Sequence, residues 1–149
     1  MLPWIALEWT DVQAWLSVAW HAVEQAAVKP VDDVLVMGAG PIGLVVIMVV
    51  ELSTTRKEFA RQCRATTVID PQEEDIVAKC RNLCDGQGLA VVLECAGVTA
   101  IMDAVCKAVR TKGLIVNVAL WDEPVPIDMM TILLGEKRTT AVIDALESG

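Results

Sequence analysis

The chain is poor in the residues that build metal sites and disulfide frameworks. Its 149 residues include one histidine and five cysteines, an odd number without a Cys-x-x-Cys pair. This set signals neither a disulfide framework nor a zinc finger. Cys80 and Cys84 are four residues apart, so two thiols on one helix face could meet a metal, but a complete ligand set is hard to find. We therefore expect free, buried or half-buried thiols and no metal site.

Positive charge is also scarce. The 12 lysines and arginines face 20 aspartates and glutamates, which gives a net charge of −8 without a basic cluster. This field opposes binding to nucleic acid and to anionic membrane surfaces, so we expect neither as a partner. The first residues have no basic flank and soon reach Glu8 and Asp11, unlike a secretory signal or a transit peptide, and a cytoplasmic location is expected.

No apolar run is long enough to be a clear membrane span. Residues 34–50 are uncharged and mostly apolar, but a spanning helix needs about 20 such residues. Gly38, Gly40, Pro41 and Gly43 also interrupt the run in its middle, which favours a strand, a turn and a helix. A membrane segment is the minor alternative.

The glycines in this run follow the pattern of a dinucleotide-binding turn. Gly38 can adopt the positive φ of a tight strand-to-helix turn, Gly40 removes a side chain where a pyrophosphate approaches, and Gly43 lets the helix lie close to the strand. Pro41 is tolerated at a first helical position, where its missing N–H has no partner. The free N–H groups of the helix start would then face the phosphates.

The rest of the chain alternates between strand and helix patterns. Strands are expected near residues 68–70, 90–94 and 114–120, and helices near 72–84 and 97–110. This rhythm predicts an α/β fold with a Rossmann-like, doubly wound parallel sheet. The length fits one domain.

Five motifs occur in an order that resembles a known family. They are residues 17–23, 33–44, 51–56, 94–98 and 117–121. The chain resembles the cofactor-binding half of medium-chain zinc-dependent alcohol dehydrogenases, nearest to the 2,3-butanediol and sorbitol dehydrogenase branch. The resemblance implies a helical segment at 1–30 from the interdomain region and an NAD-binding domain at 31–149.

The resemblance also implies cofactor-binding roles. The residues concerned are Gly38, Gly40, Pro41, Ile42, Gly43, Glu51, Arg56, Cys95, Ala96, Gly97, Val118, Ala119 and Leu120. The glycine turn would take the pyrophosphate, and Glu51 would accept hydrogen bonds from the adenosine ribose and favour NAD over NADP by like-charge repulsion. Arg56 would lie at the adenosine end, residues 95–97 would close over the cofactor, and residues 118–120 would approach the nicotinamide. As alternatives, Glu51 and Arg56 are an exposed pair near a helix start, and Cys95 and Val118 are core residues.

The sequence departs from the family pattern in its spacing. Glu51 follows Gly43 by eight positions, whereas the acidic residue of this fingerprint stands about twenty residues on. The second strand is therefore expected to be missing or shortened, which leaves the reach of Glu51 to the ribose open. Val31 and Arg64 stand where the family has glycine, and both are expected to cost stability.

The residues that hold zinc in the family have no counterpart here. Ala14 and Trp15 replace a Glu-Pro pair of the polyol branch, and His21 lies in an apolar, helix-like segment. We assign no metal ligand and no catalytic residue, and we expect the catalytic zinc domain to be absent. Four tryptophans before residue 21 are expected to be partly exposed.

These observations predict the cofactor-binding half of an NAD-dependent secondary alcohol or polyol dehydrogenase, inactive alone. The family reaction is hydride transfer between an alcohol and NAD. A catalytically inert nucleotide-binding or oligomerising module, arising as a fragment or an incorrect gene model, is the alternative, and a small membrane protein is a remote one. The expected partners are NAD(H) and a second copy, through a sheet edge or exposed apolar surface.

Overall fold

The computed structural model describes residues 9–40 and 48–143 and contains one parallel sheet between two layers of helices. The elements are α1 (Trp9–Ala26), β1 (Val34–Met37), β2 (Met48–Val50), α2 (Thr54–Gln62), β3 (Thr67–Ile69), α3 (Ile76–Leu83), β4 (Leu89–Glu94), α4 (Thr99–Ala108), β5 (Val109–Asn117), α5 (Met129–Leu134) and β6 (Arg138–Ala141). Every strand pair is parallel, in the order β3-β2-β1-β4-β5-β6. The predicted doubly wound α/β fold is confirmed.

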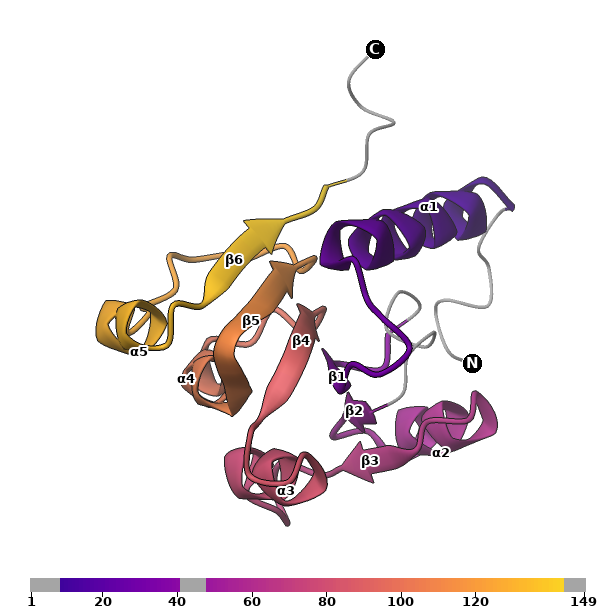
Figure 1. Cartoon of the computed structure of the whole chain (residues 1–149). Coiled ribbons are helices and arrows are strands. Elements are labelled where there is room, and N and C mark those ends of the chain that lie inside the picture. The colour runs from indigo at the N-terminus through magenta and orange to yellow at the C-terminus, as the bar shows by residue number, and fades with distance from the viewer. Residues whose placement is uncertain (1–8, 41–47, 144–149) are drawn as a thin grey trace.

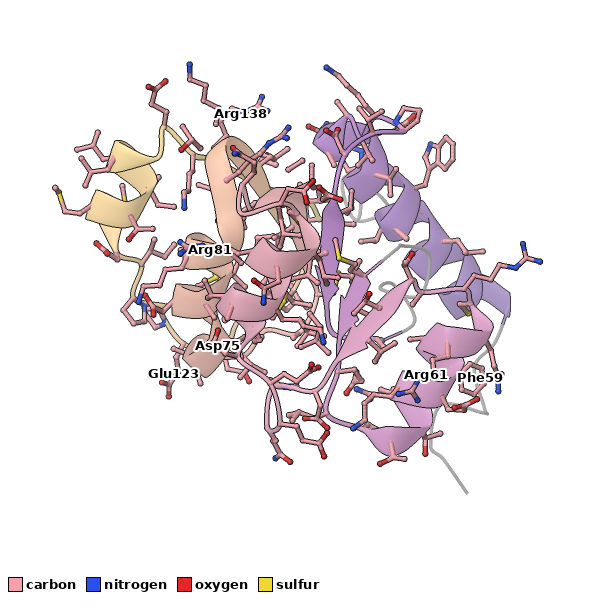
Figure 2. The ribbon with its side chains drawn as sticks, turned by 60° about the horizontal axis from the view of Figure 1, so that its bottom comes forward. Phe59, Arg61, Asp75, Arg81, Glu123 and Arg138 are labelled. Carbon is pink, nitrogen blue, oxygen red and sulfur yellow. The ribbon has the colours of Figure 1, made fainter. Side chains whose placement is uncertain are left out.

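Both faces of the sheet are covered, as the continuous apolar strands require. In β1, Leu35 and Met37 pack with residues of α3 and α4 on one face, whereas Val34 and Val36 pack with residues of α1 and α2 on the other. Figure 1 shows α1 and α2 on one side of the sheet and α3 and α4 on the opposite side. Charged side chains such as Arg61 and Glu123 lie on the outside of the molecule (Figure 2).

The second strand is present, although it is short. Residues 48–50, which the sequence assigned to a helix after the glycine turn, form β2 and pair with both β1 and β3. Uncharged, β-branched residues suit a buried strand as well as a buried helix, so periodicity could not separate the two. The expectation of a shortened strand is confirmed, and Glu51 follows β2 directly.

The boundaries of two other elements also differ from the predicted ones. The predicted helix at 72–84 begins only at Ile76, because the carboxylate of Asp75 caps it by accepting from the Ala78 N–H at 2.9 Å. Strand β5 begins at Val109, earlier than predicted, and the exposed residues 110–112 form an irregularity in its pairing with β4. Lys112, at φ 61°, marks the position where the sequence indicated a turn.

Of the two positions where the family has glycine, one adopts the left-handed conformation. Arg64, just after α2, has φ 66°, whereas Val31 is absent from the residues with positive φ. The expected backbone strain is therefore present at Arg64 and not at Val31. Trp20 is 67% exposed, as predicted, while the side chains of Trp4, Trp9 and Trp15 lie outside the described part of the structure.

We expect Arg64→Gly to stabilise the chain. Glycine has no Cβ to oppose a positive φ, so the free energy of unfolding should rise by about 1 kcal/mol, measured by urea denaturation. The control Arg61→Gly, inside α2, should instead lower it by about 1 kcal/mol through helix propensity. A loss of stability in Arg64→Gly would contradict this expectation.

The described helices include none that is both long and apolar enough to cross a membrane.

Candidate functional site

The predicted site residues of the described chain gather at the carboxyl edge of the sheet. Strands β1 and β4 are neighbours in the sheet, and the chain continues outward from β1 to β2 and from β4 to β5. This is the point at which the strand order reverses, where open α/β sheets bind their ligands. Backbone hydrogen bonds join the end of β1 to both its neighbours, because the Cys95 N–H after β4 donates to the Met37 carbonyl at 3.0 Å and the Gly38 N–H donates to the Val50 carbonyl of β2 at 2.8 Å.

The start of the glycine turn shows why glycine is needed there. Gly38 has φ 92°, and a Cβ at this position would lie 3.2 Å from both Cα and Cβ of Ala96. At Gly40, a Cβ would have no atom within 4 Å in the described part of the structure. The turn therefore touches the β4 loop at Gly38, whereas none of the other described residues crowds Gly40. Pro41, Ile42 and Gly43 lie outside the described residues.

Glu51 lies beside this turn, and only 7% of its surface is exposed. Its Oε2 accepts from the Ala39 N–H at 2.9 Å, and its Oε1 accepts from the Leu52 and Ser53 N–H groups, each at 2.9 Å. The alternative of an exposed pair near a helix start is therefore wrong for Glu51. The short second strand brings this carboxylate to the glycine turn, at the end of β2.

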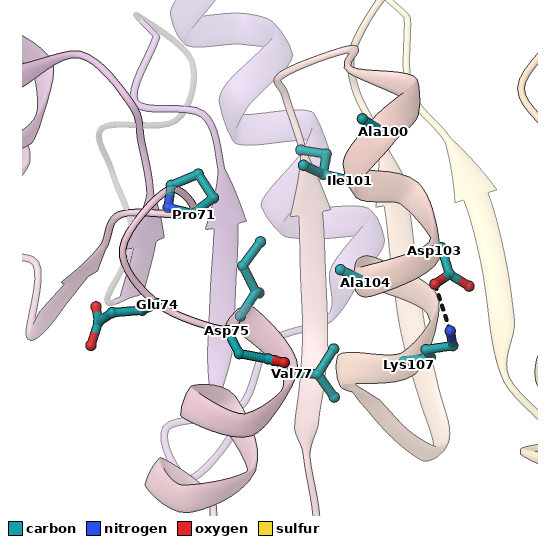
Figure 3. Close-up of a pocket in the computed structure, with 10 residues that line it drawn as sticks. Pro71, Glu74, Asp75, Val77, Ala100, Ile101, Asp103, Ala104 and Lys107 are labelled. Atoms are coloured by element: carbon teal, nitrogen blue, oxygen red, sulfur yellow. Dashed lines mark hydrogen bonds and ion pairs between the residues drawn. The ribbon is translucent and has the colours of Figure 1, made fainter.

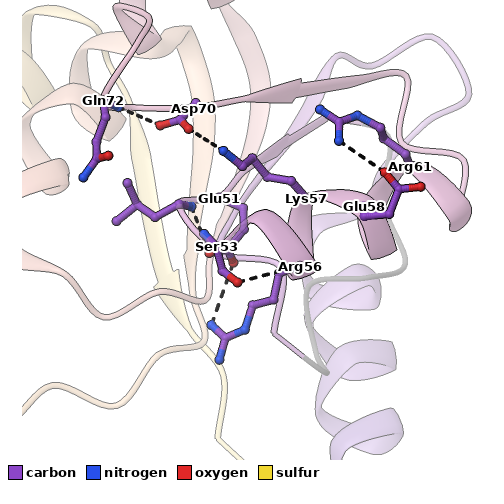
Figure 4. A network of polar contacts seen from close by, with 9 residues as sticks. Glu51, Ser53, Arg56, Lys57, Glu58, Arg61, Asp70 and Gln72 are labelled. Atoms are coloured by element: carbon purple, nitrogen blue, oxygen red, sulfur yellow. Dashed lines mark hydrogen bonds and ion pairs between the residues drawn. The ribbon is translucent and has the colours of Figure 1, made fainter. Parts of the chain in front are cut away.

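Arg56 lies in the first turn of α2 and remains half exposed. Its Nη1 is 3.8 Å from Oε2 of Glu51. The Ser53 side chain caps the helix by accepting from the Arg56 N–H at 3.5 Å (Figure 4). This places a cation at the solvent side of the Glu51 carboxylate.

The end of β4 carries a second buried carboxylate, to which the sequence assigned no function. Glu94 is fully buried. Its Oε1 accepts from the Ala96 N–H at 3.0 Å, and both its carboxylate oxygens lie 3.2 Å from the Gly97 nitrogen. Burial raises the pKa of Glu94, and the hydrogen bonds from Gly97 and Ala96 oppose that rise. The sequence shows an acidic residue after an apolar strand, but no pattern reveals that its side chain turns inward.

The three residues that follow Glu94 form a tight turn. Gly97 has φ 65°, and a Cβ there would lie 2.9 Å from the Leu120 carbonyl oxygen. Cys95 is partly buried, and burial, with a smaller contribution from the charge of Glu94, raises the pKa of its thiol to about 12. The thiol is therefore protonated near neutral pH and is a weak nucleophile.

The segment after β5 is held against this turn. The Val118 and Ala119 N–H groups donate to the Glu94 carbonyl at 2.8 and 3.0 Å. The Asn117 side chain donates to the Ala119 carbonyl at 3.0 Å and accepts from the Trp121 indole N–H at 2.7 Å. Val118 is buried in the core, as its alternative interpretation proposed, whereas Leu120 is 86% exposed. The sequence did not predict these two contacts of the Asn117 side chain.

A hollow of about 530 Å³ lies between α3 and α4 (Figure 3). It reaches the same carboxyl edge, because Pro71 follows β3 and Ala100 lies in the first turn of α4. Two of its carboxylates are paired with lysines, because Lys107 contacts Asp103 and Lys79 contacts Glu74, each at 2.6 Å, whereas Asp75 caps α3. The lining residues are Pro71, Glu74, Asp75, Ile76, Val77, Ala100, Ile101, Asp103, Ala104 and Lys107.

The described residues do not fit a zinc site. They contain no group of three or more histidine, cysteine, aspartate or glutamate side chains that could hold a metal ion. The five cysteines are free, with Cys63 exposed and Cys80, Cys84 and Cys106 buried, so the prediction of unpaired thiols is confirmed. Burial raises the pKa of Cys80 to about 12 and that of Cys84 to about 11.

Comparison with known proteins agrees with this geometry. Residues 30–144 match the family model described as zinc-binding dehydrogenase. A (R,R)-butanediol dehydrogenase of Neisseria gonorrhoeae is 33% identical over 132 residues, which cover 81% of this chain and 37% of that protein. A (R,R)-butanediol dehydrogenase of Saccharomyces cerevisiae is 32% identical, over 86% of this chain and 37% of that protein.

Solved structures show the same part of the fold. The crystal structure of 2R,3R-butanediol dehydrogenase from Bacillus subtilis superposes on this chain with a TM-score of 0.81 at 28% identity. The matched part covers 88% of this chain and 41% of the Bacillus subtilis chain. The chain thus spans less than half the length of these relatives. It belongs to the zinc-binding dehydrogenase family, of which it contains the Rossmann-like cofactor-binding part.

Proposed function

We propose that this chain binds NAD(H) across the carboxyl ends of β1, β2, β4 and β5, as the cofactor-binding half of a dehydrogenase that acts on secondary alcohols or polyols. The observation that carries the proposal is the buried carboxylate of Glu51 beside the Gly38 turn. The nicotinamide would supply hydride transfer when bound. The chain's own residues would bind and orient the cofactor.

The described residues fit such a cofactor. A dinucleotide needs close backbone approach at its pyrophosphate, and the lack of described atoms within 4 Å of a Cβ at Gly40 supports this use. It also needs an acceptor for the ribose hydroxyls, and Glu51 has the chemistry and the position after β2 for that role. The turn at 95–97 and the segment at 118–120 would form the opposite wall.

The proposal favours NAD over NADP. A 2′-phosphate would bring a second anion toward the carboxylate of Glu51, which is almost fully buried and poorly screened. Arg56 works in the other direction, but it is half exposed and its guanidinium already lies near Glu51. Repulsion at the buried group outweighs attraction at the exposed one.

A titration with both reduced cofactors tests this function. NADH should bind saturably, observed as energy transfer from tryptophan to the nicotinamide and, independently, by calorimetry. NADPH should bind at least about tenfold more weakly, because like-charge repulsion at Glu51 is worth more than about 1.4 kcal/mol. Glu58→Gln, a charge change on the exposed face of α2, is the control and should alter neither affinity. Folded protein that binds neither cofactor would refute the proposal.

We further propose that the chain self-associates through α5 and the open edge of β6. Strand β6 is the last in the sheet order, and four large apolar side chains of α5 are more than half exposed. They are Met129, Met130, Leu133 and Leu134. An exposed apolar patch beside a strand edge that pairs with no other described strand favours association between copies.

Sedimentation over roughly a hundredfold range of protein concentration tests this association. The unaltered chain should shift toward a larger species with concentration, and Leu134→Glu should shift it back toward the monomer. Phe59→Glu places the same charge on the exposed face of α2, at the other end of the sheet, and should have no effect. A monomer at every concentration would contradict the proposal.

A further inference from the structure

Glu94 is the single charged residue of an otherwise apolar strand, β4. The other residues of β4 are leucine, alanine and valine, all of them buried, and Glu94 ends the strand with no surface exposed. A buried carboxylate costs free energy that an apolar residue of similar size would not. Such a residue is expected where function, and not stability, selects it.

The side chain and the backbone carbonyl of Glu94 hold two different loops. Its carboxylate accepts from the Ala96 and Gly97 N–H groups, and its backbone carbonyl accepts from Val118 and Ala119. The carboxylate thus fixes the turn after β4, and the carbonyl fixes the segment after β5. Both loops lie at the carboxyl edge of the sheet, where they would form one wall of the proposed cofactor site.

The turn that the carboxylate holds also lies close to two neighbouring segments, the glycine turn and the segment after β5. A Cβ at Gly38 would lie only 3.2 Å from Ala96, and a Cβ at Gly97 would lie 2.9 Å from the Leu120 carbonyl oxygen. A shift of the 96–97 backbone would therefore change the spacing to the glycine turn on one side and to Leu120 on the other. Within residues 9–40 and 48–143, the polar contacts of the Glu51 carboxylate are made elsewhere, with Ala39, Leu52, Ser53 and Arg56.

We propose that Glu94 is a positioning residue for the cofactor, whose carboxylate holds the turn at 96–97 so that the wall formed with residues 118–120 fits the nicotinamide half. This inference rests on the proposed NAD(H) binding. It predicts that loss of the carboxylate weakens binding of the whole dinucleotide and spares ligands that carry only the adenosine end, which Glu51 serves.

The test combines hydrogen exchange with two ligands, NADH and ADP. In Glu94→Gln, the amides of Ala96 and Gly97 should exchange about tenfold faster, because the charged acceptor is lost. The amides of Val118 and Ala119, bonded to the Glu94 backbone, should be unchanged. NADH should bind about tenfold more weakly, and ADP within about twofold of the unaltered chain. Glu58→Gln again supplies the control for the charge change.

The outcomes separate this role from a general loss of structure and from failure of the proposed function. Unchanged exchange at Ala96 and Gly97 overturns the inference, as does a parallel loss of NADH and ADP binding. If the unaltered chain binds neither ligand, NAD(H) binding fails, while exchange still decides whether Glu94 holds the turn. Should Glu94→Gln not fold, Glu94→Asp, which keeps the charge on a shorter side chain, should show the same effects at smaller size.

Discussion

Glu51→Ala is expected to reduce NADH affinity by about a hundredfold, the largest effect on binding that we predict. Hydrogen bonds to a charged acceptor contribute about 1.5–3 kcal/mol, and the ribose of the proposed cofactor would lose the buried carboxylate that follows β2. Discrimination between NADH and NADPH should disappear with the charge. Calorimetric titration with both cofactors measures the two effects.

The same substitution should also lower stability. Without the carboxylate, the Ala39 N–H loses its buried acceptor, and an unsatisfied group of this kind costs about 1–3 kcal/mol. Glu51→Gln separates the two consequences, because its amide oxygen can still accept from Ala39 but carries no charge. Its amide nitrogen, however, cannot accept from the Leu52 and Ser53 N–H groups, so we expect Glu51→Gln to be more stable than Glu51→Ala but less stable than the unaltered chain, and to lose most of the cofactor discrimination. Full NADH affinity in Glu51→Ala would contradict the role proposed for this residue.

Gly38→Ala is expected to lower the free energy of unfolding by about 3 kcal/mol. A residue with a Cβ at φ 92° is strained by about 1–2 kcal/mol, and the added methyl group would press on the backbone of Ala96. Neither atom of Ala96 can move away without displacing the turn after β4. Urea denaturation followed by circular dichroism measures the loss.

Gly40→Ala is the matched control two residues along the same turn. No atom of the described chain lies within 4 Å of its added Cβ, and Gly40 is not among the glycines with positive φ. Its stability should therefore stay the same or rise by about 0.5 kcal/mol. Its NADH affinity should nevertheless fall, because the methyl group would occupy the space proposed for the pyrophosphate. Equal stability of the two variants would show that Gly38 does not require glycine.

Much of the fold could be predicted from the chain's own pattern. Strands β3 and β4 were predicted from short apolar runs, each bounded by turn residues, and their positions are confirmed. The position of β2 was not predicted, because residues 44–50 are apolar throughout. A run without polar interruptions has no period that would distinguish a strand from a helix. Its pairing with β1 and β3, a tertiary effect, decides the outcome.

The candidate site, like the fold, could be predicted only in part. The glycine pattern predicted the tight turn at Gly38, and the family resemblance pointed to Glu51, Gly97 and residues 118–120, which the structure brings to one edge of the sheet. Glu94 and Asn117 lay within the matching motifs, yet their roles depend on where their side chains point. That direction is set by three-dimensional packing and leaves no trace in the spacing of residues.

The position of β1 between β2 and β4 has a consequence for how the chain reaches this structure. Val34 pairs with Val91, so the centre of the sheet closes only after the chain has been made as far as β4. Until then, the four β1 residues, all fully buried in the finished protein, have β2 on one side and no partner on the other. Contacts so distant in sequence slow folding, because a large loop must close before they form. During synthesis on the ribosome, we expect β1 to β3 to form an incomplete, aggregation-prone sheet until β4 emerges.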